Sequence, residues 1–252
     1  MSAGGGVEAP LPVLYSDDHL LAVDKPAALA VHRSRLVGSD SDYLIDRLRA
    51  QAGGPVQLVH RLDRATSGIV LVARNAEIAA DLGRQLMARS VEKRYLAVCR
   101  GWPETTGQVD YPLPGVRESG PRKPALTRWQ RLATVEVPIA ISRYPCQRYA
   151  LVEIVPETGR YRQIRRHFSH IHHPLIGDTS HGRGEHNRLF REHFQSHRLL
   201  LHAWRLRLRH PVGGHPLELH APLDAGWLRL LDRFGWPSPD ASGQADAGAD
   251  PR

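Results

Sequence analysis

The sequence has 252 residues, 41% of them hydrophobic, which is enough to bury a core without disulfides or structural metals. Its 34 basic and 26 acidic residues leave a formal net charge of +8, which favours a polyanionic partner. Codon usage by itself would explain why nearly all the cations are Arg. It explains less well why eleven Arg lie between residues 160 and 209, so a nucleic-acid surface is the favoured interpretation.

The compartment is indicated by what the sequence lacks. Cys99 and Cys146 lie in apolar surroundings and are expected to be free thiols in a reducing compartment. No apolar run reaches the length of about 18 residues that a membrane span needs. Residues 1–10 show no secretory signal, so we expect a cytoplasmic protein. Residues 1–10 and 237–252 are expected to be disordered, which leaves 11–236 as one folded domain.

The elements of the first half follow from apolar runs and turn residues. Short strands are predicted at 13–15 and 20–23, and Pro26 ends the second of them. Helices are predicted at 41–51 and from Asn75 to about residue 90, with a buried strand at 68–73 between them.

The second half alternates apolar and polar residues over longer segments. Strands are predicted at 93–98, 148–155, 199–209 and 217–220, and helices at 161–171 and 224–234. From Arg205 onward one face of the third strand carries a row of cations. Strands in excess with irregularly placed helices indicate an α+β fold with a mostly antiparallel sheet.

Asp63 lies between Arg61 and Arg64 in the segment HRLDRATSG at 60–68, just before an apolar strand. Neighbouring cations keep a carboxylate ionised, and an ionised carboxylate can act as a nucleophile. A structural turn in which Asp63 bonds the backbone is the alternative, and local sequence alone favours it.

Two further segments carry candidate residues. In KRYLAV at 93–98, Tyr95 has a ring that can stack on a base and a phenol that can move a proton, although an ordinary strand Tyr explains it too. In TGRYRQIRRH at 158–167, a Gly turn leads into a helix start with four Arg, a pattern that attracts phosphates. A solvated basic helix face is the alternative, but such a face normally carries interspersed acids.

Twelve of the fifteen His lie between residues 167 and 220, which raises the question of a metal site. No HExxH, CxxC or carboxylate pattern accompanies them, so surface imidazoles or helix caps are the favoured interpretation. No nucleotide-binding motif such as GxxxxGK[ST] or GxGxxG occurs either. We therefore expect no cofactor and no metal. An enzyme without a cofactor must use its own side chains, which makes Asp63 more important as a candidate catalytic residue.

In their order, these segments resemble the RluA-like pseudouridine synthases. The resemblance rests on Asp24-Lys25-Pro26, HRLDRATSG, KRYLAV, TGRYRQIRRH and HPLIGD at 173–178, and it spans about residues 13–210. HRLDRxTSG is very specific for that family. The resemblance implies a pseudouridine synthase fold, with a mixed, mostly antiparallel sheet, flanking helices and a central basic catalytic cleft.

The family's roles carry over to matching positions as expectations. Asp63 would be the nucleophile after the target uridine flips out of its helix. Tyr95 would pack on the uracil, and Arg165 would pair with Asp63. The remaining candidates would bind RNA: His60, Arg61, Arg64, Arg160, Arg162, Gln163 and Arg166. Relatives usually have His where Arg162 stands, which puts the way the RNA backbone is held in doubt.

The stretch from Arg165 to Asn187 is most similar to the branch that modifies uridine 65 of tRNA. Several ribosomal-RNA members carry an extra S4 domain before the catalytic domain, and we expect none here, which favours tRNA. The alternatives are a synthase that acts on ribosomal RNA and a non-catalytic RNA-binding protein on the same fold. No protein partner is evident in the sequence.

Overall fold

The computed structural model describes residues 9–31, 42–116 and 120–240, so the outer parts of both predicted disordered ends lie outside the described residues. The chain divides into two compact units. Unit 1 comprises the residues up to 94 together with 203–222, and unit 2 comprises 95–202 together with the residues from 223 onward. The assignment of 11–236 to one catalytic domain stays a prediction.

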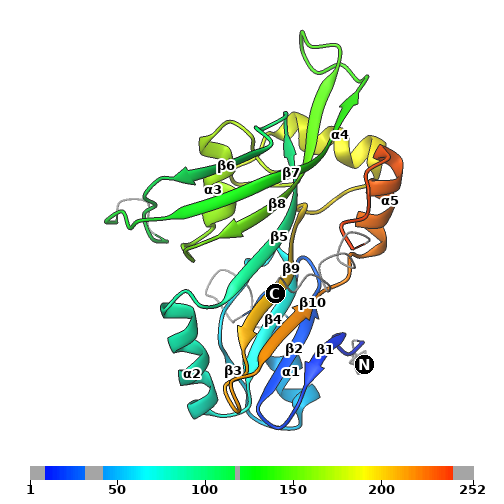
Figure 1. Ribbon diagram of the computed structural model, residues 1–252. Coiled ribbons are helices and arrows are strands. Elements are labelled where there is room, and N and C mark those ends of the chain that lie inside the picture. The colour runs from blue at the N-terminus through cyan, green and yellow to red at the C-terminus, as the bar shows by residue number, and fades with distance from the viewer. Residues whose placement is uncertain (1–8, 32–41, 117–119, 241–252) are drawn as a thin grey trace, which may run out of the picture. The chain divides into compact units, whose positions relative to one another are not determined.

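Unit 1 is built on a sheet with strand order β1-β2-β4-β9-β10, and β3 also pairs with β4 (Figure 1). Its strands are β1 (Val13–Ser16), β2 (Leu20–Lys25), β3 (Gln57–Leu58), β4 (Ser67–Ala73), β9 (Leu201–Arg209) and β10 (Pro216–His220), although the first two residues of β9 belong to unit 2. All seven residues of β4 are buried, as expected for the apolar run that follows Asp63. Helices α1 (Leu44–Ala52) and α2 (Ala76–Met87) complete the unit.

Both helices of unit 1 form for the reasons the sequence gives. Asn75 caps α2 by accepting a hydrogen bond from the Ile78 N–H at 2.9 Å. Ile78 and Leu82 on α2 pack into the same buried cluster as Leu71 of β4 and Leu206 of β9. The first predicted helix is present as α1, which buries Leu44, Ile45 and Leu48 but begins at Leu44, and Ser41 lies outside the described residues.

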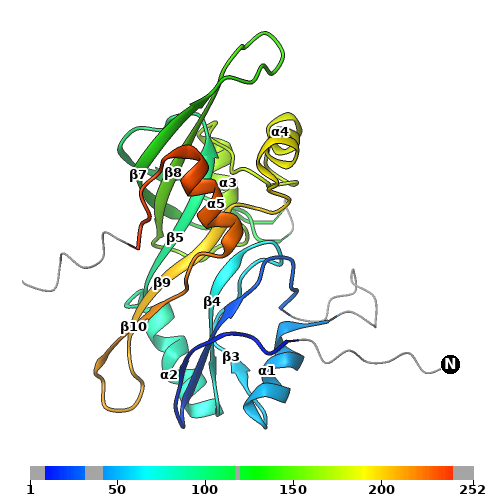
Figure 2. The same cartoon turned by 90° about the vertical axis from the view of Figure 1, so that its right-hand side faces the viewer.

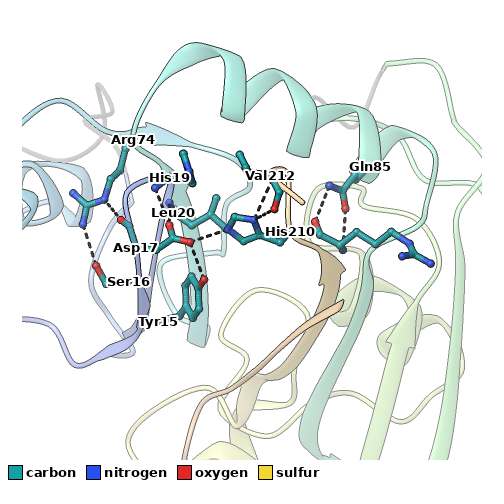
Figure 3. A network of polar contacts seen from close by, with 10 residues as sticks. Tyr15, Ser16, Asp17, His19, Leu20, Arg74, Gln85, His210 and Val212 are labelled. Carbon is teal, nitrogen blue, oxygen red and sulfur yellow. Dashed lines mark hydrogen bonds and ion pairs between the residues drawn. The ribbon is translucent and has the colours of Figure 1, made fainter. Parts of the chain in front are cut away.

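A polar network ties the β1–β2 turn of unit 1 to the segment after β9 (Figure 3). The Asp17 carboxylate accepts hydrogen bonds from the Tyr15 hydroxyl and from the N–H groups of His19 and Leu20, each at 2.7 Å. It also contacts Nε2 of His210 at 2.8 Å. Burial works to raise the pKa of Asp17, but these hydrogen bonds outweigh it and bring the value to about 2.

Unit 2 is built on a sheet with strand order β5-β8-β7-β6, in which neighbouring strands are antiparallel. These strands are β5 (Glu92–Arg100), β6 (Thr106–Asp110), β7 (Leu126–Val137) and β8 (Gln147–Pro156), although the first three residues of β5 belong to unit 1. Three helices accompany them: α3 (Gln163–His170), α4 (Gly184–Phe194) and α5 (Ala225–Phe234). The predicted α+β fold with a mostly antiparallel sheet is confirmed.

The helices of unit 2 cover opposite faces of its sheet (Figure 2). Phe168 of α3 meets Trp129 of β7 edge-on, with ring centroids 5.8 Å apart. Tyr149 projects from the other face of β8 and meets Phe190 of α4 at 4.8 Å, and Phe190 in turn meets Phe234 of α5. None of the helices in the described ranges is both long and apolar enough to span a bilayer.

Candidate active site

Asp63 of unit 1 lies in a tight turn immediately before β4. Its carbonyl oxygen accepts a hydrogen bond from the Thr66 N–H at 3.1 Å, so the turn that local sequence predicted is present. The Asp63 side chain is half-buried, whereas Thr66 and Ser67 are almost fully buried. The turn thus anchors its far end in the core and leaves the carboxylate partly accessible.

Lys25, which the sequence analysis placed at a strand end and within a motif of the resemblance but gave no role, holds this turn in place. The side chain is fully buried at 0% exposure, and its ammonium donates hydrogen bonds to the carbonyl oxygens of Pro26, Leu29 and Arg64 at 2.8–3.2 Å. Arg64 reciprocates through Nε, which donates to the Ala28 carbonyl at 2.9 Å. A buried ammonium needs such acceptors, and here they fix the backbone next to Asp63.

Gly68 explains why a glycine ends the HRLDRATSG segment. Its φ is +107°, in the region that favours glycine, and a Cβ there would lie 2.2 Å from the Ala203 carbonyl oxygen of β9. The close approach of β4 and β9 therefore requires glycine at this position. A side chain at 68 would displace the strand that carries the Asp63 turn.

His60 and Arg61 have different environments within the same loop. Nε2 of His60 accepts a hydrogen bond from the Leu71 N–H at 3.2 Å. Burial, and secondarily the charge of Lys93, lower the pKa of His60 to about 4, so the ring is neutral at pH 7. Arg61 is exposed, as a residue that contacts RNA must be. His60 has only one ring nitrogen left for RNA, because the other already accepts the hydrogen bond from Leu71.

In unit 2, the side chain of Gln163 organises the turn that precedes α3. Its carbonyl oxygen accepts from the Thr158 hydroxyl at 2.7 Å and from the Arg160 N–H at 3.0 Å. Its amide nitrogen donates to the Leu126 carbonyl and the Thr127 hydroxyl, both at 2.9 Å. The side chain is 4% exposed and fixes the basic turn from within, so its RNA-binding role stays a prediction.

The other arginines of this turn support loops of the same unit. Arg162 has a left-handed backbone (φ +51°), and its guanidinium donates to the Ser180 hydroxyl at 3.1 Å. Arg160 and Arg166 donate to the Pro124 and Pro114 carbonyls at 3.1 and 2.9 Å. Arg166 is only 9% exposed, whereas Arg160 and Arg162 are half-buried.

Arg165 forms a buried bidentate ion pair that the sequence did not reveal. Nε and Nη2 of Arg165 donate to the two carboxylate oxygens of Asp178 at 2.8 and 2.7 Å. The side chains are 5% and 0% exposed. Burial works to raise the pKa of Asp178, but Arg165 and two backbone N–H groups, at Ser180 and His181, hold it below its usual range. In the sequence, Asp178 stood out only as the last residue of the HPLIGD motif, which was noted for the resemblance and not for an ion pair.

Tyr95 projects from the sheet face that α3 covers. It lies opposite Ile154 of β8, which in turn lies opposite Trp129 of β7. Directly opposed residues share a face, and the ring of Trp129 meets Phe168 of α3. Tyr95 and the helix that carries Arg165 are therefore on the same side of this sheet.

The candidates fall into two groups, one in each unit. His60, Arg61, Asp63 and Arg64 share the loop before β4, whereas Tyr95, Arg160, Arg162, Gln163, Arg165 and Arg166 belong to unit 2. The pairing of Asp63 with Arg165 and the basic cleft stay predictions.

The interpretation of the histidines as surface imidazoles is wrong for several of them. His167, His186, His202 and His210 are at most 6% exposed. His167, for example, bonds the Thr127 hydroxyl through Nδ1 and the Tyr111 carbonyl through Nε2, because both ring nitrogens need partners in the core. In the described ranges, no cluster of three or more His, Cys, Asp or Glu is arranged to hold a metal ion.

Comparison with known proteins gives one consistent result. The family model described as RNA pseudouridylate synthase matches residues 19–170. The tRNA pseudouridine synthase C of Pectobacterium carotovorum subsp. carotovorum is 44% identical, over 95% of this chain and 68% of that protein. The protein of the same name from Vibrio cholerae is 43% identical, over 90% of this chain and 96% of its own length. Among solved structures, human RNA pseudouridylate synthase domain containing 1 covers all of both chains with a TM-score of 0.72 at 26% identity.

Proposed function

Because this chain belongs to the RNA pseudouridylate synthase family, whose members are isomerases, we propose that it converts uridine to pseudouridine in tRNA, at uridine 65. The observation that carries the proposal is the Asp63 turn. The Asp63 side chain is half-buried, and the buried ammonium of Lys25 fixes the neighbouring backbone by a hydrogen bond to the Arg64 carbonyl. The choice of tRNA is supported by the two bacterial relatives, which are named for that substrate.

The proposed reaction rearranges bonds without adding or removing atoms. The target uridine leaves the stack of its helix, and the Asp63 carboxylate attacks either the uracil ring or the ribose anomeric carbon. The C1′–N1 bond breaks, the uracil turns, and a C1′–C5 bond forms. The C5 hydrogen then leaves as a proton, N1 takes up a proton, and the Asp63 carboxylate is regenerated.

The other candidates have distinct tasks in this mechanism. Tyr95 packs on the flipped uracil and assists the proton transfer at C5. A guanidinium has five N–H donors, and Asp178 accepts two of those of Arg165. We assign another of them to the Asp63 carboxylate, which keeps it ionised. Arg61, Arg64, Arg160 and Arg162 bind the RNA backbone.

The purified chain tests the proposal directly. With tRNA transcripts labelled with tritium at C5 of uridine, the chain should release tritium, and sequencing should map the new pseudouridine to position 65. Asp63→Ala should fold and bind tRNA but lose the reaction, because the carboxylate that attacks the uridine in this mechanism is removed. Asp18→Ala, which removes an exposed Asp elsewhere in unit 1, is the matched control. Pseudouridine formed by Asp63→Ala, or formed only in ribosomal RNA offered in parallel, would overturn the proposal.

A further inference from the structure

Unit 2 contains a cavity of about 510 Å³ that the proposed reaction does not use. It lies where β5 ends and β8 begins, next to α4, and its lining includes Arg100, Tyr144, Cys146, Gln147, Arg148 and His186. A cavity of this size falls in the range that holds a nucleotide-sized ligand.

Arg100 is the group in the cavity whose charge is not matched. Its side chain is half-buried, and among the described residues its guanidinium has neither an ion pair nor a hydrogen bond. Glu136, a carboxylate of the same lining, already pairs with Arg148 at 3.0 Å. The neighbouring His186 is neutral at pH 7, because burial and the charges of Arg100 and Arg183 lower its pKa to about 4. A half-buried cation without a partner is stabilised by an anionic ligand.

Two exposed aromatic rings lie against arginines at this cavity: Tyr144 lines it, and Trp102 contacts the lining residue Arg148. Arg148 lies 4.5 Å from the ring centroid of Trp102, which is 39% exposed. Arg143 lies 5.1 Å from the ring centroid of Tyr144, which is 53% exposed. Exposed rings beside arginines are the means by which proteins bind unstacked nucleotides, since the ring holds the base and the guanidinium holds the phosphate.

The loop that carries Tyr144 is held in a fixed shape. Ile141 and Tyr144 exchange two backbone hydrogen bonds at 3.0 and 3.1 Å, and the buried Gln147 amide donates to the Tyr144 carbonyl at 3.0 Å. A preformed loop loses less conformational entropy when a ligand binds.

The cavity is remote from the residue expected to meet the uracil. Tyr95 and Arg100 are five positions apart on β5, which corresponds to roughly 17 Å at about 3.3 Å per residue. A nucleotide in the cavity would therefore not be the uridine that is isomerised.

We propose that this cavity is a second RNA-binding site that takes a nucleotide of the substrate outside the isomerised position, with its phosphate on Arg100 and its base against Tyr144. The inference rests on the proposed function for the presence of an RNA substrate. It adds a positioning contact at the far end of the β5–β8 strands.

Variants of the full chain test this site by their affinity for a tRNA transcript. Arg100→Met should weaken binding about tenfold, because a charge-assisted contact to phosphate is lost while the side-chain volume is kept. Tyr144→Ala should weaken it by a similar factor, about that of one base stack. Arg84→Met removes a surface arginine of α2 and should leave the affinity within about twofold. Equal affinity of the Arg84 and Arg100 variants would overturn the inference.

A thiol in the cavity gives a second test that uses the unaltered chain. Cys146 lines the cavity and is half-buried, whereas burial raises the pKa of the Cys99 thiol and keeps it unreactive. Saturating tRNA should slow alkylation of Cys146 by N-ethylmaleimide at least about fivefold, and an unchanged rate would overturn the site. Absence of pseudouridine in the same preparation would instead count against the proposed function, while the alkylation rates still decide this inference.

Discussion

Arg61 and Arg165 look alike in the sequence but have opposite environments in the structure. Arg61 is exposed beside Asp63, whereas Arg165 is 4% exposed and bound at two nitrogens by Asp178. The burial of an arginine on α3 has a physical cost, because both charges leave water. The ion pair holds the Arg165 guanidinium in one orientation, which the proposed contact with the Asp63 carboxylate requires.

The Arg165–Asp178 pair predicts a large loss of stability when one charge is removed. Asp178→Asn should lower the free energy of unfolding by about 3 kcal/mol, since it leaves a buried guanidinium without its anion. Urea unfolding followed by circular dichroism measures this change.

A surface ion pair provides the control for Asp178→Asn. Asp81 pairs with Arg84 on the exposed side of α2, so Asp81→Asn should cost no more than about 0.5 kcal/mol. Equal losses of stability in the two variants would show that the buried Arg165–Asp178 pair contributes no more to folding than a surface ion pair.

Individual residues were predictable from the sequence only where a local pattern identified them. The turn at Asp63 could be predicted because Thr66, Ser67 and Gly68 follow it, whereas its role as the nucleophile stays a prediction. Asp178 could not be identified, because its partner lies thirteen positions away and an Asp after Gly177 is typical of any turn. Lys25 was missed because a lysine at a strand end usually lies in solvent, whereas here three carbonyl groups bind it in the core.

Among the elements, the sequence identified those with a strong apolar run or a cap. The buried strand β4 and the capped helix α2 are examples. Strand β7 and helix α4 were missed. Strand β7 has mostly polar residues on its exposed positions, and the polar residues of α4 (GEHNRLFREHF) obscured a face that buries only His186, Asn187, Leu189 and Phe190. In both elements, contacts with the rest of the fold provide the stabilisation that the local sequence does not indicate.

The network around Asp17 predicts how strongly the β1–β2 turn is held at different pH values (Figure 3). Because the folded-state pKa of about 2 lies below the ordinary 3.8, the folded state binds fewer protons than the unfolded state between these values. The stabilisation is therefore complete above about pH 4 and is lost as the pH falls towards 2. Asp17→Asn should cost at most about 2 kcal/mol at pH 7, measured by urea unfolding.

The adjacent Asp18 is the matched control, because it is exposed in the same turn and makes no hydrogen bond or ion pair within the described ranges. Asp18→Asn should change the unfolding free energy by less than about 0.5 kcal/mol. Similar losses for both variants would show that general surface charge, and not the network with Tyr15 and His210, accounts for the effect.

For the molecule as a whole, composition predicted the class of partner but not how the charges are distributed. The net charge of +8 indicated a polyanion. The structure separates the arginines by role: Arg165 and Arg166 are buried, while Arg207 and Arg209 of β9 are exposed in the predicted row. Only arginines that solvent reaches can release counterions from RNA, so the formal charge overstates the number of phosphate contacts.

Salt titration of tRNA binding measures that number. With about six phosphate contacts, affinity should fall on the order of several-hundred-fold between about 50 and 200 mM salt, through counterion release. Asp63→Ala should give the same logarithmic slope, because in the proposed reaction the Asp63 carboxylate attacks the uridine and contacts no phosphate. Arg100→Met should reduce the slope by about one contact, since it removes one cation from the second site. A flat salt response of the unaltered chain would exclude the exposed arginines as the RNA-binding surface.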